Sequence, residues 1–339
     1  MKTVRNILVS CLISIFAIVT AQAGELSVTG GMKIANTKKG GTETGNGLGQ
    51  DTELTFSGST ELENGMTATY KQTVNDSFGF NDSELMFTTF FGTIGLSSTG
   101  GSIEDIDNIV PTAYEEAEAL IGFSSTGFLD VGLNDGTYGI VYKNAVPGTG
   151  MNVTAFYAPK GEQGDAAADD SVSGAVTSDN DKAYSIYLRG NPLGLIDGVD
   201  FAIGYENSTT HGSQSTDAKE DARSYTAALN YAYGPVKVGV QGGWLESGSH
   251  LQTQEEGYKN TNVGIAYAIN DNLSVSYQNT KSTKVNWNGT SVQTDIDGYS
   301  VAYTMGGATI AYVQNKAKNA DYTADKELTG NQIAIALAF

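Results

Sequence analysis

The chain ends on a pattern that few folds can accommodate. Over its last residues, a large apolar side chain occupies every second position, with smaller side chains between. Period-two alternation puts these large side chains on one face of a strand: Ile333, Ile335, Leu337 and Phe339. The ends of soluble chains are usually polar and loosely held. A transmembrane β-barrel suits such a strand, because one face meets lipid, the other meets a polar lumen, and closure pairs both edges.

The same alternation recurs throughout the chain and predicts sixteen strands. An even number leaves both termini of a barrel on one side. The predicted strands are 25–37, 51–62, 66–75, 82–91, 93–99, 136–143, 150–158, 181–190, 199–208, 223–233, 236–246, 258–269, 272–282, 295–305, 308–318 and 330–339.

Short links alternate with long polar segments between these strands. This asymmetry is typical of barrels that have short periplasmic turns and longer external loops. The long segments run over roughly 38–50, 76–81, 100–135, 159–180, 209–222, 247–257, 283–294 and 319–329. Three hairpins resemble one another, which would also suit a β-propeller, but propeller blades do not segregate loop lengths in this way.

Parity assigns each strand residue to the lipid or to the lumen. The residues predicted to face lipid are Tyr225, Leu229, Tyr231, Val238, Val240, Trp244, Val263, Ile265, Tyr267, Val275, Tyr277, Val301, Tyr303, Ile310 and Tyr312. The residues predicted to face inwards are Ser274, Ser276, Gln278, Ser300, Thr304 and Gln332. A polar lining indicates water inside a wide barrel. The alternative, a soluble β-sandwich with one wet face, lacks the inward apolar volume for a core.

The N-terminus has the features of an export signal. Lys2 and Arg5 precede an apolar run that ends in small residues before Gly24. The run is shorter than the roughly 20 residues of a membrane helix. The sequence therefore predicts a signal peptide over residues 1–23 and a single barrel domain over residues 24–339.

Cysteine usage and charge exclude several classes of protein. Cys11 loosely fits a lipoprotein cleavage site, but the apolar core continues past it, which favours export without lipidation. The mature chain would then have no cysteine, so barrel closure must replace disulfides as a source of stability. Removing Lys2 and Arg5 leaves 17 basic residues against 38 acidic ones and moves the formal charge from −19 to −21. No nucleic-acid partner is expected for so acidic a chain.

The complete pattern resembles the general diffusion porins of Gram-negative bacteria, especially those of alphaproteobacteria. The resemblance covers essentially the whole chain, and its final Phe339 is similar to the terminal assembly signal of that class. No short motif is diagnostic. The resemblance implies a 16-stranded antiparallel transmembrane β-barrel in the cell outer membrane, surrounded by lipid and assembled as a homotrimer. It also implies that the long third loop folds into the lumen and forms a constriction.

The third long segment, 100–135, carries the most concentrated charge in the chain. Six of its acidic residues fall within fifteen positions: Glu104, Asp105, Asp107, Glu115, Glu116 and Glu118. No Lys or Arg lies between Lys71 and Lys143. Rings of carboxylates in a narrow pore attract cations. Such acids could also simply solvate an exposed loop, but long loops in compact domains are usually functional, which favours a constriction.

The basic side of the pore follows from the resemblance together with parity. In the porins that this chain resembles, acids on the inserted loop oppose basic residues on the wall. Lys33 and Lys71 face the lumen by parity and are the candidate partners. Arg189 and Lys237 also face inwards, nearer the periplasmic rim. Because only two arginines remain after cleavage, no rigid arginine ladder is expected, and the sequence predicts a preference for cations.

No cofactor and no enzymatic activity are expected. Glu104, Asp105 and Asp107 offer oxygen ligands for calcium, but their spacing is not that of an EF-hand loop, and unordered counter-ions are the better interpretation. His211 and His250 fall in predicted loops, and nothing joins either of them to a nucleophile and an orienting group.

Three functional hypotheses remain open. The first is a passive porin for small hydrophilic solutes and ions. The second is a substrate-specific channel, which would need converging lumen aromatics or cations, yet only Tyr187 among the tyrosines falls clearly inside by parity. The third is a non-conducting barrel that acts as a surface adhesin or anchor. The scarcity of large inward apolar residues argues against a lumen plugged by its own walls.

Overall fold

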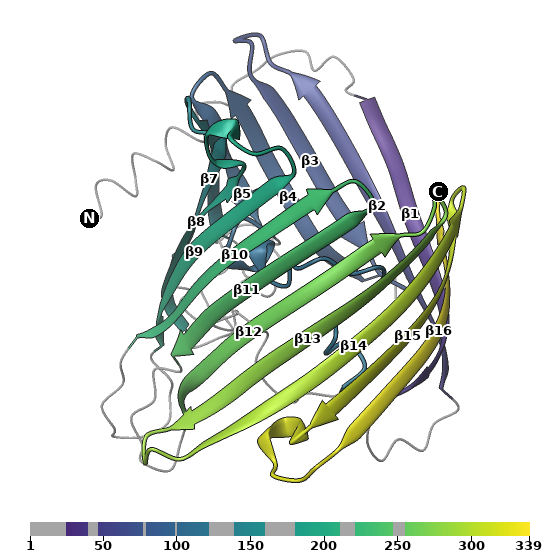
Figure 1. The fold of residues 1–339 in the computed structure, drawn as a ribbon. Coiled ribbons are helices and arrows are strands. Elements are labelled where there is room, and N and C mark those ends of the chain that lie inside the picture. The colour runs from purple at the N-terminus through teal and green to yellow at the C-terminus, as the bar shows by residue number, and fades with distance from the viewer. Residues whose placement is uncertain are drawn as a thin grey trace.

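Sixteen strands close into one antiparallel barrel in the computed structural model (Figure 1). The structure describes residues 25–39, 47–76, 79–98, 100–121, 139–159, 180–210, 221–246 and 255–339. The strands are β1 (Glu25–Lys38), β2 (Leu48–Glu61), β3 (Thr67–Val74), β4 (Phe80–Thr89), β5 (Gly92–Ser97), β6 (Gly139–Val146), β7 (Met151–Ala158), β8 (Asn180–Gly190), β9 (Val199–Thr210), β10 (Ala222–Tyr233), β11 (Val236–Glu246), β12 (Glu255–Ala268), β13 (Leu273–Asn286), β14 (Ser291–Met305), β15 (Ala308–Lys318) and β16 (Leu328–Ala338).

Three short 3₁₀ turns complete the secondary structure. They are η1 (Ile103–Ile106), η2 (Pro192–Gly194) and η3 (Ala320–Tyr322). Among the residues that the structure describes, no helix is long and apolar enough to cross a membrane. The predicted signal peptide over residues 1–23 lies outside the described residues.

The first and last strands pair to close the barrel. β1 runs antiparallel to β16, with a register from Gly31 opposite Ala338 to Lys38 opposite Asn331. Beyond that ladder, the Gly30 amide donates to the Phe339 carbonyl at 2.7 Å, and the Phe339 amide donates to the Gly30 carbonyl at 2.9 Å. Closure removes both sheet edges, so every strand has a partner on each side.

The predicted count of sixteen strands is confirmed, but some boundaries were wrong. β13 and β14 extend to Asn286 and from Ser291, so the loop expected over residues 283–294 shrinks to residues 287–290. These extensions are mostly polar and carry one isolated valine each, Val285 and Val292, so they show no hydrophobic alternation that could reveal them. The strand expected from residue 136 is described from Gly139, and residues 136–138 lie outside the described part.

The connections at one end of the barrel are all of eight residues or fewer, and the longer ones lie at the other end together with shorter ones such as 287–290. The connections at the first end are residues 62–66, 90–91, 147–150, 191–198, 234–235, 269–272 and 306–307. We call this rim the short-turn end and the opposite rim the long-loop end. In outer-membrane barrels these rims face the periplasm and the exterior, respectively.

Side-chain orientation follows the predicted parity. Tyr231, Val263 and Ile310 are exposed on the outer surface, whereas Gln278 and Ser300 are buried inside. One expectation was wrong, because large apolar residues do occur on the inner face. They form an apolar cluster on β4 and β6 to β8: Met86, Val141, Phe156, Ala158 and Ala183.

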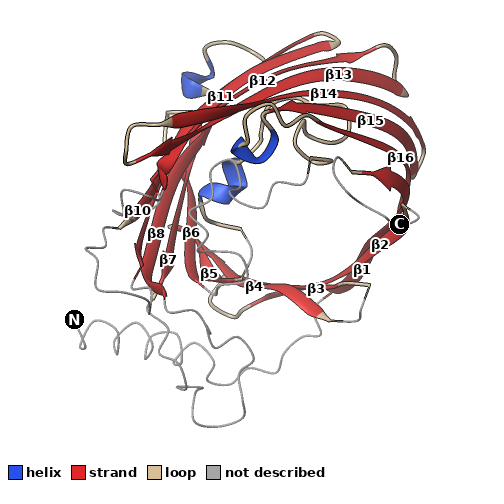
Figure 2. Ribbon diagram, turned by 90° about the horizontal axis from the view of Figure 1, so that it is seen from below, coloured by secondary structure: helices blue, strands red, loops and turns tan. Residues whose placement is uncertain are grey.

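The barrel is not empty. Figure 2 looks along it and shows part of the chain inside the ring of strands. This chain includes residues 100–121, which we call the inner segment. It makes hydrogen bonds to side chains of β10, β11, β13 and β15, among others.

The pairing of β1 with β16 predicts separate roles for the backbone hydrogen bonds of Phe339 and for its aromatic ring. Deleting Phe339 removes both Gly30 hydrogen bonds, which together contribute about 2 kcal/mol, and also removes the ring. Phe339→Ala keeps both bonds and loses only the ring. We expect the deletion to lower the thermal unfolding temperature in detergent more than the substitution does, measured by heat-modifiable migration on gels. Equal stability of the two variants would contradict a role for these bonds.

Candidate pore constriction

Amide side chains on the inner wall hold the backbone of the inner segment. The backbone amides of Ile109, Ala113, Ala117 and Leu120 each donate to a side chain that points inwards. Their acceptors are Gln241 Oε1 at 3.1 Å, Ser276 Oγ at 2.8 Å, Gln278 Oε1 at 2.6 Å and Asn315 Oδ1 at 3.1 Å, respectively. An irregular backbone has no ladder of its own, so these side chains satisfy groups that would otherwise be buried without partners.

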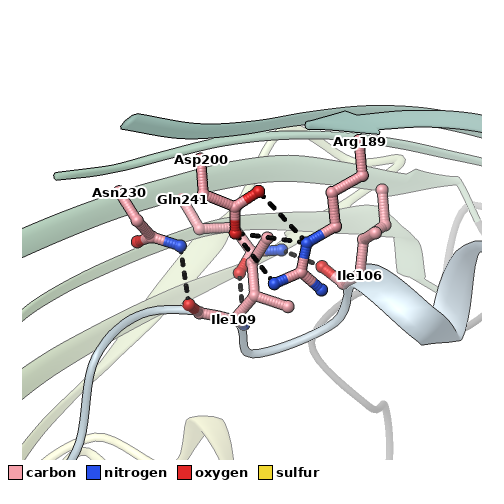
Figure 3. A network of polar contacts seen from close by, with 6 residues as sticks. All are labelled: Ile106, Ile109, Arg189, Asp200, Asn230 and Gln241. Carbon is pink, nitrogen blue, oxygen red and sulfur yellow. Dashed lines mark hydrogen bonds and ion pairs between the residues drawn. The ribbon is translucent and has the colours of Figure 1, made fainter. Parts of the chain in front are cut away.

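Bonds in the opposite direction fix the same backbone. Gln241 Nε2 donates to the Ile106 carbonyl at 2.7 Å, and Asn230 Nδ2 donates to the Ile109 carbonyl at 2.8 Å (Figure 3). Asn315 Nδ2 donates to the Glu116 carbonyl at 3.2 Å. Gln241 and Asn315 therefore each both accept from and donate to the segment, which sets its register along the wall.

Glycines on the inner face let the segment approach the strands closely. A Cβ atom at Gly298 would lie 2.5 Å from the Cα of Ala117, and one at Gly264 would lie 2.6 Å from a methyl of Val110. Neither distance is possible for real atoms, so only glycine fits. An added Cβ would lie less than 3.0 Å from the segment at each of five inward glycines on five strands, which we call the glycine seat: Gly204, Gly239, Gly264, Gly298 and Gly330.

Apolar side chains anchor the start of the segment. Ile103 and Ile106 of η1 are fully buried and pack against Ala202 of β9 and Ala228 of β10. The hydroxyl of Ser102 caps η1 by accepting from the Glu104 amide at 3.3 Å. The end of the segment is anchored similarly, because Ala117 and Ile121 pack with Ile296 of β14.

Lys33 is the predicted basic residue that the structure joins to the acidic segment. Its Nζ lies 3.0 Å from Glu115 Oε1, and both side chains are partly exposed. Asp51 lies opposite Lys33 in the β1–β2 register, so a wall carboxylate competes for the same ammonium. Lys71 faces the lumen but lies opposite Glu84 of β4. Among the described residues no ion pair joins Lys71 to the segment.

The other predicted acids have distinct environments. Asp105 accepts from the Tyr187 hydroxyl and from the Gly101 amide, both at 2.7 Å, so it ties η1 to the wall. Glu104 and Glu116 are partly exposed. Burial raises the pKa of Glu116 above its ordinary value, with Glu115 adding to the effect.

Glu118 is the most deeply placed of the six acids. Its Oε2 accepts from the Thr280 hydroxyl at 3.2 Å, and its Oε1 is shielded from solvent without a hydrogen bond. Burial raises the pKa of Glu118 to about 7, and the nearby Glu116 and Asp107 raise it further against the hydrogen bond from Thr280. The acids that the sequence groups together are therefore not equivalent.

The sequence predicted that Arg189 faces inwards but did not reveal its partner, and it did not single out Tyr258. Arg189 donates to Asp200 from both Nε and Nη2, with Nη2 at 2.8 Å from Oδ2, beside Ile106 and Ile109 (Figure 3). Tyr258 is buried inside and packs on Tyr322 with a ring separation of 5.3 Å, so Tyr187 is not alone among inward tyrosines. Parity along the strand was the available signal, because Val263, Ile265 and Tyr267 face lipid and Tyr258 therefore falls on the inner face.

No metal centre is evident in the described part of the chain. There, no group of three or more His, Cys, Asp or Glu side chains could hold a metal ion. His211 and His250 lie outside the described residues.

A closed sixteen-strand barrel with a polar lining and an inner segment defines a channel protein of the outer membrane. Comparison with known protein families supports the same class, since the model of the Gram-negative porin family matches residues 15–326. The chain belongs to the Gram-negative porin family. It resides in the outer membrane and functions there as a channel. No curated protein sequence matches it.

Solved structures share the fold at low sequence identity. OmpT of Vibrio cholerae has a TM-score of 0.66 at 13% identity, covering 95% of this chain and 100% of OmpT. An anion-selective porin from Comamonas acidovorans has a TM-score of 0.64 at 14% identity, covering 93% and 100%. A mutant of the Rh. blastica porin has a TM-score of 0.59 at 14% identity, also covering 93% and 100%. At these identities the likeness shows the fold alone.

The glycine seat predicts that lumen width depends on single wall positions. Gly298→Val would push Ala117 off the wall and into the lumen, so we expect a lower single-channel conductance in planar bilayers with the barrel still folded. Gly49→Val is the matched control, because Gly49 also faces the lumen and has no atom within 4 Å of an added Cβ. An unchanged conductance in Gly298→Val would contradict the role of the glycine seat in setting the width of the lumen.

Glu118 predicts a pH dependence of the docked segment. Its raised pKa means that the docked state binds the proton more tightly than a solvated loop does. Docking is therefore strongest below the ordinary pKa of 4.5, weakens as the pH rises from there, and has lost this contribution above about 7. We expect current noise in the open state to increase between about pH 4.5 and pH 7 and to level off above that range. Glu118→Gln should remove that change and Glu61→Gln should not; an unaltered pH profile in Glu118→Gln would contradict this assignment.

Proposed function

We propose that this protein is a water-filled porin through which small hydrophilic solutes and ions diffuse passively. In this proposal the inner segment forms the constriction and gives the pore a preference for cations. The observation that carries it is the acidic segment docked along the inner wall and paired with Lys33 through Glu115 at 3.0 Å. Passage would depend on lumen width and on the field at the segment, with no chemical step.

The wall opposite the segment supports the direction of selectivity. Lys33 and Lys71 are the lumen-facing cations on β1 and β3, and register places Asp51 and Glu84 directly beside them. The positive charges of these two lysines are therefore partly balanced by neighbouring carboxylates on the wall. The segment itself contains no Lys or Arg to balance its acids. Low-dielectric walls focus such an imbalance in a narrow pore, so cations should be enriched there.

Short strands on one side support assembly as a homotrimer. β3 and β7 have 8 residues each and β5 has 6, whereas a tilted strand needs about 9–11 residues to cross the hydrocarbon. The strands on this side of the barrel are too short to span the hydrocarbon of the bilayer. Contact with neighbouring subunits would cover this side and remove its exposure to lipid. A structure of the V. cholerae OmpT is described as a trimer form, and its sequence identity to this chain is 14%.

Planar-bilayer recording distinguishes this proposal from its two competitors. Conductance in steps of three would support an open trimeric porin. Specific block by one solute would instead indicate a substrate-specific channel. Negligible conductance from folded protein would indicate a barrel that acts as an adhesin or anchor.

Reversal potentials in a salt gradient test the cation preference. We expect potassium to permeate better than chloride, and we expect Glu104→Gln combined with Glu116→Gln to reduce that ratio severalfold because it removes charge at the constriction. Glu63→Gln combined with Asp271→Asn is the control, since it removes the same charge from turns at the short-turn end. Anion preference in the unmodified protein would overturn the proposal.

A further inference from the structure

A cavity of about 510 Å³ lies between the inner segment and the wall, beside the closure of the barrel. Residues of β1, β2 and β16 form its wall side, and these strands are neighbours in the ring (Figure 2). Glu115, Ala119 and Leu120 of the inner segment form its other side. We call it the closure cavity. Its volume is within the range of sites that bind small molecules, whereas passive diffusion alone requires no such recess.

The closure cavity exists because one row of the wall carries only small side chains. Ala35 of β1 lies opposite Gly49 of β2 and opposite Ala334 of β16, and all three face inwards. A Cβ atom added to Gly49 would meet no other atom within 4 Å, so this row borders open space. The rows on either side carry polar and charged side chains. A ligand in the cavity would therefore lie over small residues, with polar groups at both of its ends.

Four charged side chains line the closure cavity, and their charges sum to zero. Lys33 and Glu115 pair with each other at 3.0 Å. Asp51 and Lys39 are exposed, and among the described residues neither belongs to an ion pair. Asp51 shares the row of Lys33, whereas Lys39 lies about 20 Å further towards the long-loop end, just beyond β1. The cavity thus has an acid at its inner end and a base at its outer end that can both bind a ligand.

An amide between these two charges lacks part of its hydrogen bonding. Gln332 of β16 lines the cavity opposite Thr37 of β1, and only 7% of the residue is exposed. Its Nε2 donates to the Thr37 hydroxyl at 2.8 Å, but its Oε1 has no hydrogen-bond partner among the described residues. A buried amide oxygen of this kind needs a donor. The terminal torsion of Gln is broad, and the Thr37 hydroxyl can donate or accept, so the amide can turn its oxygen towards a ligand.

We propose that the closure cavity binds a short zwitterionic peptide on its way through the lumen. This site depends on the proposed channel function, because the peptide would reach the cavity from a water-filled lumen. The peptide ammonium would lie at Asp51, a backbone N–H would donate to Gln332 Oε1, and the carboxylate would lie at Lys39. An extended tripeptide spans about 10 Å, and the flexible side chain of Lys39 covers the remaining distance.

The chemistry of the cavity favours this ligand over other small solutes. A sugar would leave Asp51 and Lys39 without opposite charges, and a single ion would satisfy only one of them. A free amino acid carries both charges next to the same carbon, so it cannot contact both ends of the cavity. A peptide also supplies the backbone N–H that Gln332 requires. Charge complementarity and the unpartnered amide therefore indicate the same class of ligand.

Triglycine is the probe, because it supplies both charges and the backbone N–H without a side chain. Saturation-transfer NMR on the folded protein in detergent reports binding, and planar-bilayer conductance with added triglycine reports occupancy of the lumen. We expect saturable binding together with a saturable decrease in conductance. Triglycine that is acetylated at its N-terminus and amidated at its C-terminus should bind roughly tenfold more weakly or worse, because each hydrogen bond to a charged group contributes about tenfold.

Substitutions at both ends of the cavity test the assignment of residues. D51N/K39Q should weaken triglycine binding roughly tenfold or more, and the conservative D51E/K39R should retain it. Gln332→Met keeps the length of the side chain but loses the amide, so it should weaken binding severalfold. The control E61Q/K237Q also removes one acid and one base from the inner wall, near the short-turn end, and should bind as the unmodified protein does.

Three results would overturn the peptide site: unchanged binding in D51N/K39Q, equal loss of binding in the control, or equal binding of the capped peptide. NMR detects binding without requiring a conducting channel. Loss of binding with normal conductance would therefore refute the site alone, whereas absent conductance from folded protein would refute the proposed channel. Should the double variant not fold, K39Q alone should still weaken binding severalfold, since Lys39 lies beyond the strand, and unchanged binding there would also refute the site.

Discussion

Backbone hydrogen bonding in a medium without water is the constraint on which this structure depends. A strand in hydrocarbon must pair along both edges, and the chain meets this condition only by joining β16 to β1. Closure fixes which face of every strand is inside, because each register is locked to the next around the ring. The positions of Lys33, Gln241 and the glycine seat all follow from that single circular register.

The inner segment repeats the same constraint on a smaller scale. Residues 100–121 lack strand partners along most of their length, so their amides and carbonyls need other groups. Asn and Gln side chains on the wall supply them, since an amide can both donate and accept. The wall is therefore polar for two reasons: water fills part of the lumen, and part of the lining is itself a set of backbone partners.

Much of the fold could be predicted from the sequence, but less of the site. Alternation is a local property, so sixteen strands and the inward position of Gln278 were accessible from it. The contact of Gln278 with Ala117 joins positions 161 residues apart, and no local pattern encodes it. The same limit explains why Lys33, and not Lys71, meets the segment. The six acids looked alike as a cluster, yet the depth of Glu118 depends on β13, which lies far along the chain. The sequence did contain a signal for the close approach of the inner segment to the wall, namely the glycines on the inner face. The alternation of inward and outward positions could have identified these glycines as one group.

Under the proposed function, the glycine seat and the acidic side chains would act on different properties of the pore. The seat sets how far the segment stands from the wall through close contacts with both backbone and side-chain atoms of the segment, and a larger residue there would have to displace them. Acids such as Glu104 and Glu116 project from that fixed track and can change without moving it. Under the proposed function, aperture and ionic preference would be encoded by separate positions, so a few substitutions of acidic side chains could reverse the charge of the pore and keep the same size limit.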